Sequence, residues 1–216
     1  MKVISTKGIH ADGVKMLVYG ASGVGKTVLC STAPNPIIIS AEKGLLSLSG
    51  LDIPAVEVTS FKEVQEVYKA TRKGEWDTIC LDSISEIAEI VLAEYKGMVN
   101  DGRQAYGMLN DTINGLIRDF RDIPEKNVVF TAKELKDETG AIMVSRPSMP
   151  GKTLTNGIAY FFDEVFFMKS TKNGRMLHTL DSSTYNAKDR SGRLEKLEEA
   201  NLTNVMRKIS NGTTSL

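Results

Sequence analysis

The sequence has few of the residues that form the disulfide bonds of small secreted domains or bind transition metals. It contains two cysteines and two histidines in 216 residues. Cys30 and Cys80 fall in predicted core segments, which favours small buried side chains over a disulfide or a metal pair. His10 and His178 stand far apart, with no cysteine or carboxylate at ligand spacing. The sequence therefore predicts no transition-metal site.

Long apolar segments and a charge of one sign are also lacking. No apolar run approaches the ~20 residues that cross a bilayer, and the amino terminus lacks the basic-then-apolar pattern of a secretory signal. We therefore expect a cytoplasmic protein with no membrane partner. The 27 basic side chains balance 27 acidic ones, which argues against coating of nucleic acid through bulk charge but leaves room for a local basic groove.

One segment carries a specific chemical signal. Residues 20–27 are Gly-Ala-Ser-Gly-Val-Gly-Lys-Thr, which matches the G-x-x-x-x-G-K-[ST] pattern of a phosphate-binding loop. In that pattern backbone N–H groups cradle the phosphates of a nucleoside triphosphate, the lysine reaches the β/γ oxygens and the hydroxyl holds Mg²⁺. An apolar strand is predicted before the loop and a helix after it. The predicted nucleotide-binding residues are Gly20, Ala21, Ser22, Gly23, Val24, Gly25, Lys26, Thr27 and Val28, with Thr27 as a direct Mg²⁺ ligand.

The rest of the chain alternates short apolar runs with amphipathic stretches. The candidate strands are 14–19, 36–40, 55–58, 77–82, 127–132, 161–168 and 175–180. Helical periodicity is clearest in 83–96, 108–120 and 62–71. This order predicts one α/β domain over 1–216, with a mostly parallel twisted sheet, helices on both faces and a C-terminal β extension. The sequence further predicts an N-terminal arm at 1–13, a hairpin and loop outside the sheet at 134–153, and a flexible tail at 210–216.

Polar residues at strand ends are candidate site residues, because ligands of parallel sheets bind at the carboxyl ends of the strands. Asp82 closes one predicted strand and would hold Mg²⁺ through water, although its position also suits the N-cap of the next helix. Glu42 would activate the attacking water as general base if its strand adjoins that of Asp82; a solvated surface glutamate is the alternative. Lys133 follows a third strand, where it would either sense the γ-phosphate or remain a surface lysine.

The order of these strand ends resembles that of the RecA-like P-loop NTPases, which include recombinases and hexameric helicases. The stretch around Glu42, Ser-Ala-Glu-Lys-Gly-Leu, is similar to the one that carries the general base of that family. The Walker B strand ends in Asp82-Ser83, as in RecA-like proteins, rather than in the Asp-Glu typical of AAA+ proteins. The sensor strand also resembles the family's, except that recombinases carry glutamine at the position of Lys133.

The resemblance covers roughly residues 14–192 and is closest to compact phage-encoded ATPases of single-strand annealing and recombination. Residues 187–192, Ala-Lys-Asp-Arg-Ser-Gly, look like the basic finger motif of hexameric members. This likeness implies that Lys188 and Arg190 act in trans on the γ-phosphate of a neighbouring subunit, within a ring or filament. Two surface charges on a turn are the alternative. A phage-encoded protein would act in the cytoplasm of the bacterial host.

The resemblance also implies two DNA-binding loops, at 97–107 and 136–153, with the glycines of the first making it mobile. The candidate contacts with single-stranded DNA are Arg103, Tyr106, Lys136, Arg146 and Lys152, of which Tyr106 would stack on a base. Each of them would otherwise be an ordinary solvated loop residue. A single-strand-binding protein is a possible further partner.

The sequence thus predicts a Mg²⁺-dependent ATPase, stimulated by single-stranded DNA, that promotes annealing or homologous recombination. Three other functions remain open at this point. A hexameric helicase or motor would share the phosphate loop and the basic finger. A small-molecule kinase would need an arginine-rich lid, and 134–153 holds one arginine. A nucleotide-dependent switch without DNA is the third, although no N-K-x-D guanine motif follows the expected strand.

Overall fold

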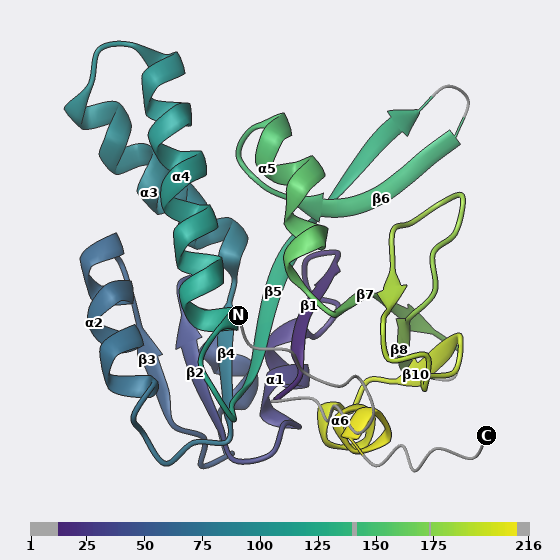
Figure 1. Cartoon of the computed structure of the whole chain (residues 1–216). Coiled ribbons are helices and arrows are strands. Elements are labelled where there is room, and N and C mark those ends of the chain that lie inside the picture. Colours follow the sequence, from purple (N-terminus) through teal and green to yellow (C-terminus); the bar gives the residue numbers. More distant parts are fainter. Residues whose placement is uncertain (1–12, 140–141, 173, 211–216) are drawn as a thin grey trace, which may run out of the picture.

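The computed structural model describes residues 13–139, 142–172 and 174–210. Most of the predicted N-terminal arm and tail, together with His10 and Gly140, lie outside the described residues. A ten-stranded sheet runs through the molecule in the order β10-β8-β7-β1-β5-β4-β2-β3, with β6 paired to β5 and β9 to β7 (Figure 1). Its parallel strands are β1 (Lys15–Gly20), β2 (Pro36–Ser40), β3 (Ala55–Glu57), β4 (Thr78–Asp82), β5 (Asn127–Thr139) and β7 (Glu164–Thr171).

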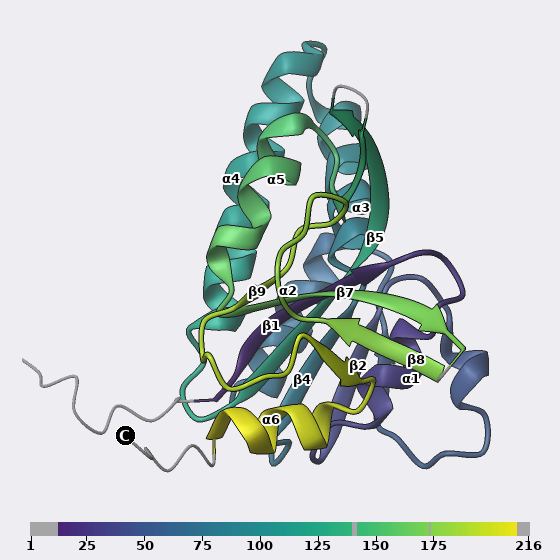
Figure 2. The same cartoon turned by 90° about the vertical axis from the view of Figure 1, so that its right-hand side faces the viewer.

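Helices cover both faces of this sheet, as the sequence predicts (Figure 2). One face carries α2 (Phe61–Thr71), α3 (Ile84–Met98), α4 (Gly102–Arg121), α5 (Lys152–Gly157) and the 3-10 helix η2 (Ile158–Phe161). The other face carries α1 (Lys26–Ser31), the 3-10 helix η1 (Leu45–Leu48) and α6 (Leu202–Ser210). None of the described helices is long and apolar enough to cross a membrane.

Strand β1 shows why the central strands have continuous apolar sequences. Leu17 and Tyr19 pack into the cluster on the α3–α4 face, whereas Met16 and Val18 pack into the cluster on the α1–α6 face. Successive side chains of a strand point to opposite faces, so a strand covered on both sides buries all of them. Cys30 on α1 and Cys80 on β4 are buried in the cluster on the α1–α6 face as free thiols, and their burial confirms the prediction.

The predicted C-terminal β extension is also present. Strands β8 (Gly174–His178) and β10 (Leu197–Glu199) add to the sheet beyond β7, and β9 (Lys188–Asp189) pairs with the start of β7. All three pairings are antiparallel, in contrast to the parallel centre. The predicted strand 161–168 begins later, at Glu164, because η2 occupies its first position.

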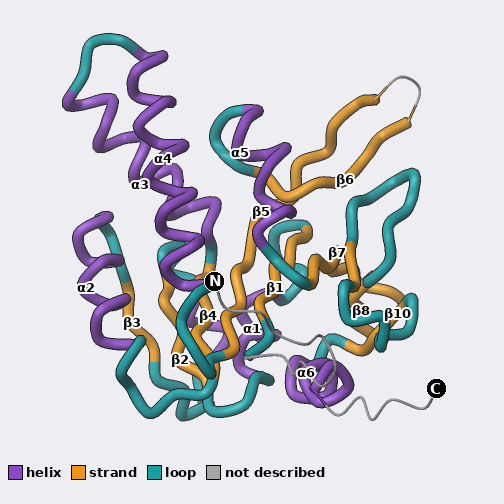
Figure 3. Tube along the Cα trace, in the orientation of Figure 1, coloured by secondary structure: helices purple, strands orange, loops and turns teal. Residues whose placement is uncertain are grey.

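The predicted mobile loop at 97–107 is wrong, because most of it is helical (Figure 3). Helix α3 continues to Met98, and α4 starts only four residues later, with Asp101 as its N-cap. The Asp101 carboxylate accepts a hydrogen bond from the backbone N–H of Arg103 at 2.8 Å. This cap and the buried apolar face of α4 outweigh the low helix propensity of the glycines. The residues concerned are Gly97 in α3 and Gly102, Arg103, Tyr106 and Gly107 in α4.

The segment 134–153 is a regular hairpin over most of its length. Strand β5 runs without a break from the sheet to Thr139 and pairs antiparallel with β6 (Ile142–Ser148). The predicted hairpin is therefore confirmed, but the loop predicted within 134–153 is shorter than expected, because β6 continues to Ser148. Pro147 lies within β6, opposite Glu134, and a proline is tolerated there because β6 is an edge strand.

Candidate nucleotide-binding site

The phosphate-binding loop joins the carboxyl end of β1 to the first residue of α1. Gly23 and Gly25 have φ angles of 74° and 103°, which residues with a side chain rarely adopt. The backbone N–H of Val24 donates to the Ala21 carbonyl at 3.3 Å and closes a turn within the loop. The local sequence thus has the glycines where this backbone needs them, which makes the loop a cradle of N–H groups for phosphate.

Lys26 lies across this loop. Its Nζ donates to the carbonyl oxygens of Gly20 at 2.9 Å and Ala21 at 3.0 Å, and the residue is only 8% exposed. Burial lowers the pKa of the Lys26 ammonium, while the carboxylates of Glu42 and Asp82 act in the opposite direction. A poorly hydrated ammonium held by two neutral carbonyls is suited to a phosphate, because charge-assisted hydrogen bonds are the stronger kind.

Asp82 and Thr27 form the predicted metal-handling pair. The Thr27 hydroxyl donates to Asp82 Oδ2 at 2.6 Å, and the Thr131 hydroxyl donates to Oδ1 at 2.5 Å. Hard oxygen donors of this kind suit Mg²⁺, which usually keeps several waters and takes one or two protein ligands. The N-cap alternative for Asp82 is wrong: Ser83 caps α3, and its Oγ accepts from the Glu86 N–H at 3.3 Å.

Glu42 meets the condition set by the sequence, since β2 and β4 are neighbours. Their register places Ser40 opposite Asp82, so both carboxylates lie at the same end of adjacent strands. The Ser83 hydroxyl donates a hydrogen bond to Glu42 Oε1. The Glu42 side chain is exposed, as a base that must reach a water molecule needs to be.

Lys133 lies at the same edge of the sheet, in register with Gly20. Its ammonium donates to Glu86 at 2.6 Å and to Glu89 at 3.2 Å, both on α3. Burial alone would lower the pKa of Lys133, but the two carboxylates outweigh it and raise the pKa. The side chain is thus held against α3, and its role as a γ-phosphate sensor stays a prediction.

Comparison with known families agrees with this geometry. Residues 12–191 match a family described as an AAA domain, AAA_24. The chain belongs to this family of P-loop NTPases. No curated protein matches the chain. The family match makes the chain a nucleotide-binding domain of the ATPase type, and it fits the mixed α/β architecture with its mostly parallel sheet.

The two basic finger residues of this AAA-domain chain lie far from its own phosphate loop. Lys188 pairs with Val165 near the start of β7, at the amino end of the sheet, whereas the loop follows the carboxyl end of β1. Lys188 Nζ donates to the Ala159 carbonyl at 2.9 Å, and Arg190 forms an ion pair with Asp163 at 2.6 Å. Any action of the pair on a γ-phosphate would therefore need a neighbouring subunit, and that role stays a prediction.

The candidate DNA contacts lie on three elements that project beyond the carboxyl edge of the sheet: the α3–α4 pair, the β5–β6 hairpin and α5 (Figure 1). Lys96 on α3 lies over the Tyr106 ring, with its Nζ 5.5 Å from the ring centroid. Gly151, next to Lys152, approaches the same ring: a Cβ there would be 3.2 Å from Tyr106 Cδ1. Arg146 lies 3.8 Å from Asp137 across the hairpin.

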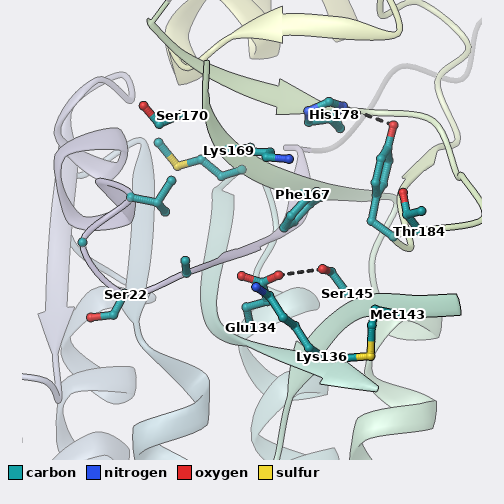
Figure 4. Close-up of a pocket in the computed structure, with 15 residues that line it drawn as sticks. Ser22, Glu134, Lys136, Met143, Ser145, Phe167, Lys169, Ser170, His178 and Thr184 are labelled. Atoms are coloured by element: carbon teal, nitrogen blue, oxygen red, sulfur yellow. Dashed lines mark hydrogen bonds between the residues drawn. The ribbon is translucent and has the colours of Figure 1, made fainter. Parts of the chain in front are cut away.

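The structure adds site residues that the sequence analysis missed. Thr131 lies in the predicted strand 127–132, but the sequence indicated no role for it. In the structure its hydroxyl donates a hydrogen bond to the Asp82 carboxylate. A cavity of about 690 Å³ also opens beside the phosphate loop, between the hairpin and β7–β8 (Figure 4). The Phe167 and Tyr185 rings stack in its wall with centroids 5.2 Å apart. No local pattern marks these aromatic residues, because they come together only through the fold.

Proposed function

We propose that this chain hydrolyses ATP and couples hydrolysis to binding of single-stranded DNA, in annealing or homologous recombination. The observation that carries this proposal is the continuity of β5. The strand holds Thr131 on Asp82 at the phosphate end of the sheet and then runs directly into the hairpin that bears Lys136. Changes at the nucleotide are thereby linked through a single strand to the projecting hairpin that carries the candidate DNA contacts Lys136 and Arg146.

A second link joins the loop to the hairpin. The hydroxyl of Tyr19, the residue before the phosphate loop, lies 2.9 Å from the Ser145 carbonyl oxygen and 2.7 Å from the Asn186 carbonyl oxygen, which share its one proton. It also accepts from the Asn186 N–H at 3.0 Å. Ser145 belongs to the hairpin, and Asn186 precedes the segment with Lys188. This buried hydroxyl therefore supports coupling between nucleotide, hairpin and the basic pair.

The residues of the site support hydrolysis by direct attack of water. Lys26 would bind the β/γ oxygens, and Thr27 and Asp82 would hold Mg²⁺, which neutralises phosphate charge when bound. Glu42, oriented by the Ser83 hydroxyl, would accept the proton of the attacking water. Lys188 and Arg190 of an adjacent subunit would stabilise the charge that develops on the transferred phosphoryl group.

On the DNA side, the proposal rests on cations and a ring carried by the projecting elements. A strand laid over them would meet charges for its phosphates and one aromatic platform for a base. These residues are Arg103, Tyr106, Lys136, Arg146 and Lys152, and a single-strand-binding protein is a candidate partner on the same DNA.

A ring-forming helicase or motor is a second candidate function. It is favoured by the position of Lys188 and Arg190 at the amino end of the sheet, opposite the phosphate loop. Two such faces on one subunit suit head-to-tail contacts, which close into rings or extend as filaments. A kinase is less favoured, since the segment that would supply its lid is a paired hairpin.

The test is steady-state ATP hydrolysis with and without single-stranded DNA, at low and physiological salt, with duplex DNA as a control. We expect single strands to stimulate hydrolysis several-fold and salt to weaken the effect, because phosphate contacts release counterions. Lys136→Ala should reduce stimulation and leave the DNA-free rate unchanged. Lys62→Ala, an exposed cation on α2, is the matched control. Hydrolysis indifferent to DNA would contradict the proposal and favour a partner-dependent motor.

A further inference from the structure

A second cation of the same chain packs against the phosphate-binding loop. Arg175 projects from β8, and its guanidinium covers the space beside Gly25. A Cβ built on Gly25 would lie 2.6 Å from Arg175 Cζ, 2.7 Å from Nη1 and 2.8 Å from Nε. Gly25 directly precedes Lys26, so the guanidinium lies at the mouth of the loop although its residue is far away in the sequence.

The guanidinium group of Arg175 is accessible to a ligand. Arg175 lines a pocket of about 310 Å³ with Gly25, Val28 and Leu29 on the loop and α1 side. Glu199 lines the same pocket, yet within the described part of the chain no ion pair joins Arg175 to a carboxylate. The Arg175 side chain is exposed. An unpaired guanidinium beside a phosphate cradle is placed to bind an anion there.

The backbone of Arg175, by contrast, is fixed. Its residue pairs with Ser170 of β7, and its carbonyl accepts from the Ala200 N–H at 3.1 Å. Strand β8 thus lies between β7 and β10 in the sheet. The paired strand fixes where the Arg175 side chain starts, so binding has to order only the side chain and not the backbone.

Strand order tells which part of the nucleotide Arg175 can reach. Asp82 approaches Thr27 of the loop from β4, on one side of β1, whereas β8 lies on the other side, beyond β7. The backbone of such loops cradles the α- and β-phosphates, with the metal and general base directed at the γ-phosphate. Arg175 lies over Gly25 and next to Val28, on the flank away from Asp82.

We propose that Arg175 is a nucleotide-binding residue that contacts the α- or β-phosphate of the nucleotide held by its own chain. The inference rests on the nucleotide-binding part of the proposed function and is independent of DNA. Because the contact is made equally to ATP and ADP, it adds affinity for both and leaves the hydrolytic step to Glu42. Removal of one charged hydrogen-bonding partner typically lowers affinity about tenfold or more.

The experiment is equilibrium binding of ATP and of ADP, each with Mg²⁺ and without DNA, by isothermal titration calorimetry. We expect Arg175→Ala to weaken both nucleotides by the same factor, about tenfold or more. Arg175→Lys should retain part of the affinity, because it keeps the charge but not the planar fork. Arg207→Ala is the matched control, since that exposed arginine contacts Asn204 within its own helix. Lys26→Ala gives the nucleotide affinity of a protein whose phosphate-binding loop has lost its lysine, for comparison.

Two results would overturn the proposal. Unchanged affinity for both ATP and ADP in Arg175→Ala would show that the guanidinium does not touch the nucleotide. A loss confined to ATP would place it at the γ-phosphate instead. Thermal melting of each variant, and the conservative Arg175→Lys variant, separate a binding defect from misfolding. If single-stranded DNA does not stimulate hydrolysis, the proposed function is contradicted but the inference about Arg175 is not. If the wild-type protein does not bind nucleotide, both are contradicted.

Discussion

One buried carboxylate, Asp82, organises the centre of the nucleotide site. It is 1% exposed and accepts hydrogen bonds from the hydroxyls of Thr27 and Thr131. Burial of a carboxylate without such donors would cost several kcal/mol. The hydrogen bonds from the two threonines offset this cost. Ser83, the next residue, orients Glu42. In the proposed mechanism, Asp82 at the end of β4 would bind the metal with Thr27, and Glu42 just beyond the neighbouring strand β2 would activate the water.

At the residue scale, we predict that Glu42→Gln separates nucleotide binding from hydrolysis. The amide keeps the size of the side chain and its contact with Ser83, but it cannot accept a proton. Loss of a general base typically costs 10²–10⁴-fold in rate, so kcat should fall by about 100-fold or more. Nucleotide affinity, measured by calorimetry, should stay within about twofold.

Glu66→Gln on the exposed face of α2 serves as the control for this change and should hydrolyse ATP normally. A Glu42→Gln protein with the wild-type rate would remove Glu42 from the catalytic role. It would leave the binding roles of Lys26 and Thr27 untouched.

At the element scale, a buried acid joins the start of β7 to the turn after β9. Glu164 is 1% exposed, and its Oε1 accepts from the Ser191 N–H at 3.2 Å. Burial, and then the charge of nearby Asp189, raises the pKa of Glu164 to about 8. The side chain therefore carries its proton at neutral pH, next to the segment with Lys188 and Arg190.

This pKa predicts a pH-dependent stability. In the unfolded chain the Glu164 carboxyl ionises near pH 4.5, whereas the folded protein holds its proton until about pH 8. Its contribution to the free energy of unfolding is therefore greatest below pH 4.5 and is lost as the pH rises towards 8. Glu164→Gln cannot ionise, so its stability relative to wild type should rise across this window. One pKa unit corresponds to about 1.4 kcal/mol, and we expect a change of more than 1 kcal/mol.

Urea unfolding at pH 5 and pH 8.5 measures this change, with both proteins compared at each pH. A stability difference that is the same at the two pH values would show that Glu164 titrates normally in the folded state.

At the scale of the whole molecule, the phosphate loop and the basic pair lie at opposite ends of one sheet. A complete site would then combine the loop of one subunit with Lys188 and Arg190 of the next. We predict that Lys26→Ala and the Lys188→Ala/Arg190→Ala double variant are each inactive alone. When mixed, they should regain part of the wild-type rate, because some interfaces join an intact loop to an intact basic pair.

The measurement is ATP hydrolysis of the mixture against the sum of the separate proteins, together with the oligomeric state by light scattering. Full activity of the double variant alone would exclude the basic pair from hydrolysis. A mixture of assembled but inactive oligomers would exclude its action in trans.

Local sequence was sufficient for the features that depend on local chemistry. The phosphate loop was predictable because its glycines, lysine and threonine must follow one another in the chain. The strand at 36–40 was predictable as well, since burial on both faces demands the continuous apolar run Ile37–Ile39. The position of Asp82 at the end of a buried strand was predictable in the same way, and the structure brings the Thr27 hydroxyl to its carboxylate.

Tertiary structure alone decided the features that depend on strand order and on competing local preferences. Strand β2 lies beside β4 rather than β1, and this neighbourhood brings Glu42 to Ser83. The start of α4 depended on the Asp101 cap and on burial, which outweigh the glycines of that segment. Arg175 meets Gly25 because α1 packs on the face of the sheet to which β8 contributes Leu177. Contacts between residues far apart in the chain carry no local signal, so the sequence determined the chemistry of the loop and the fold determined what surrounds it.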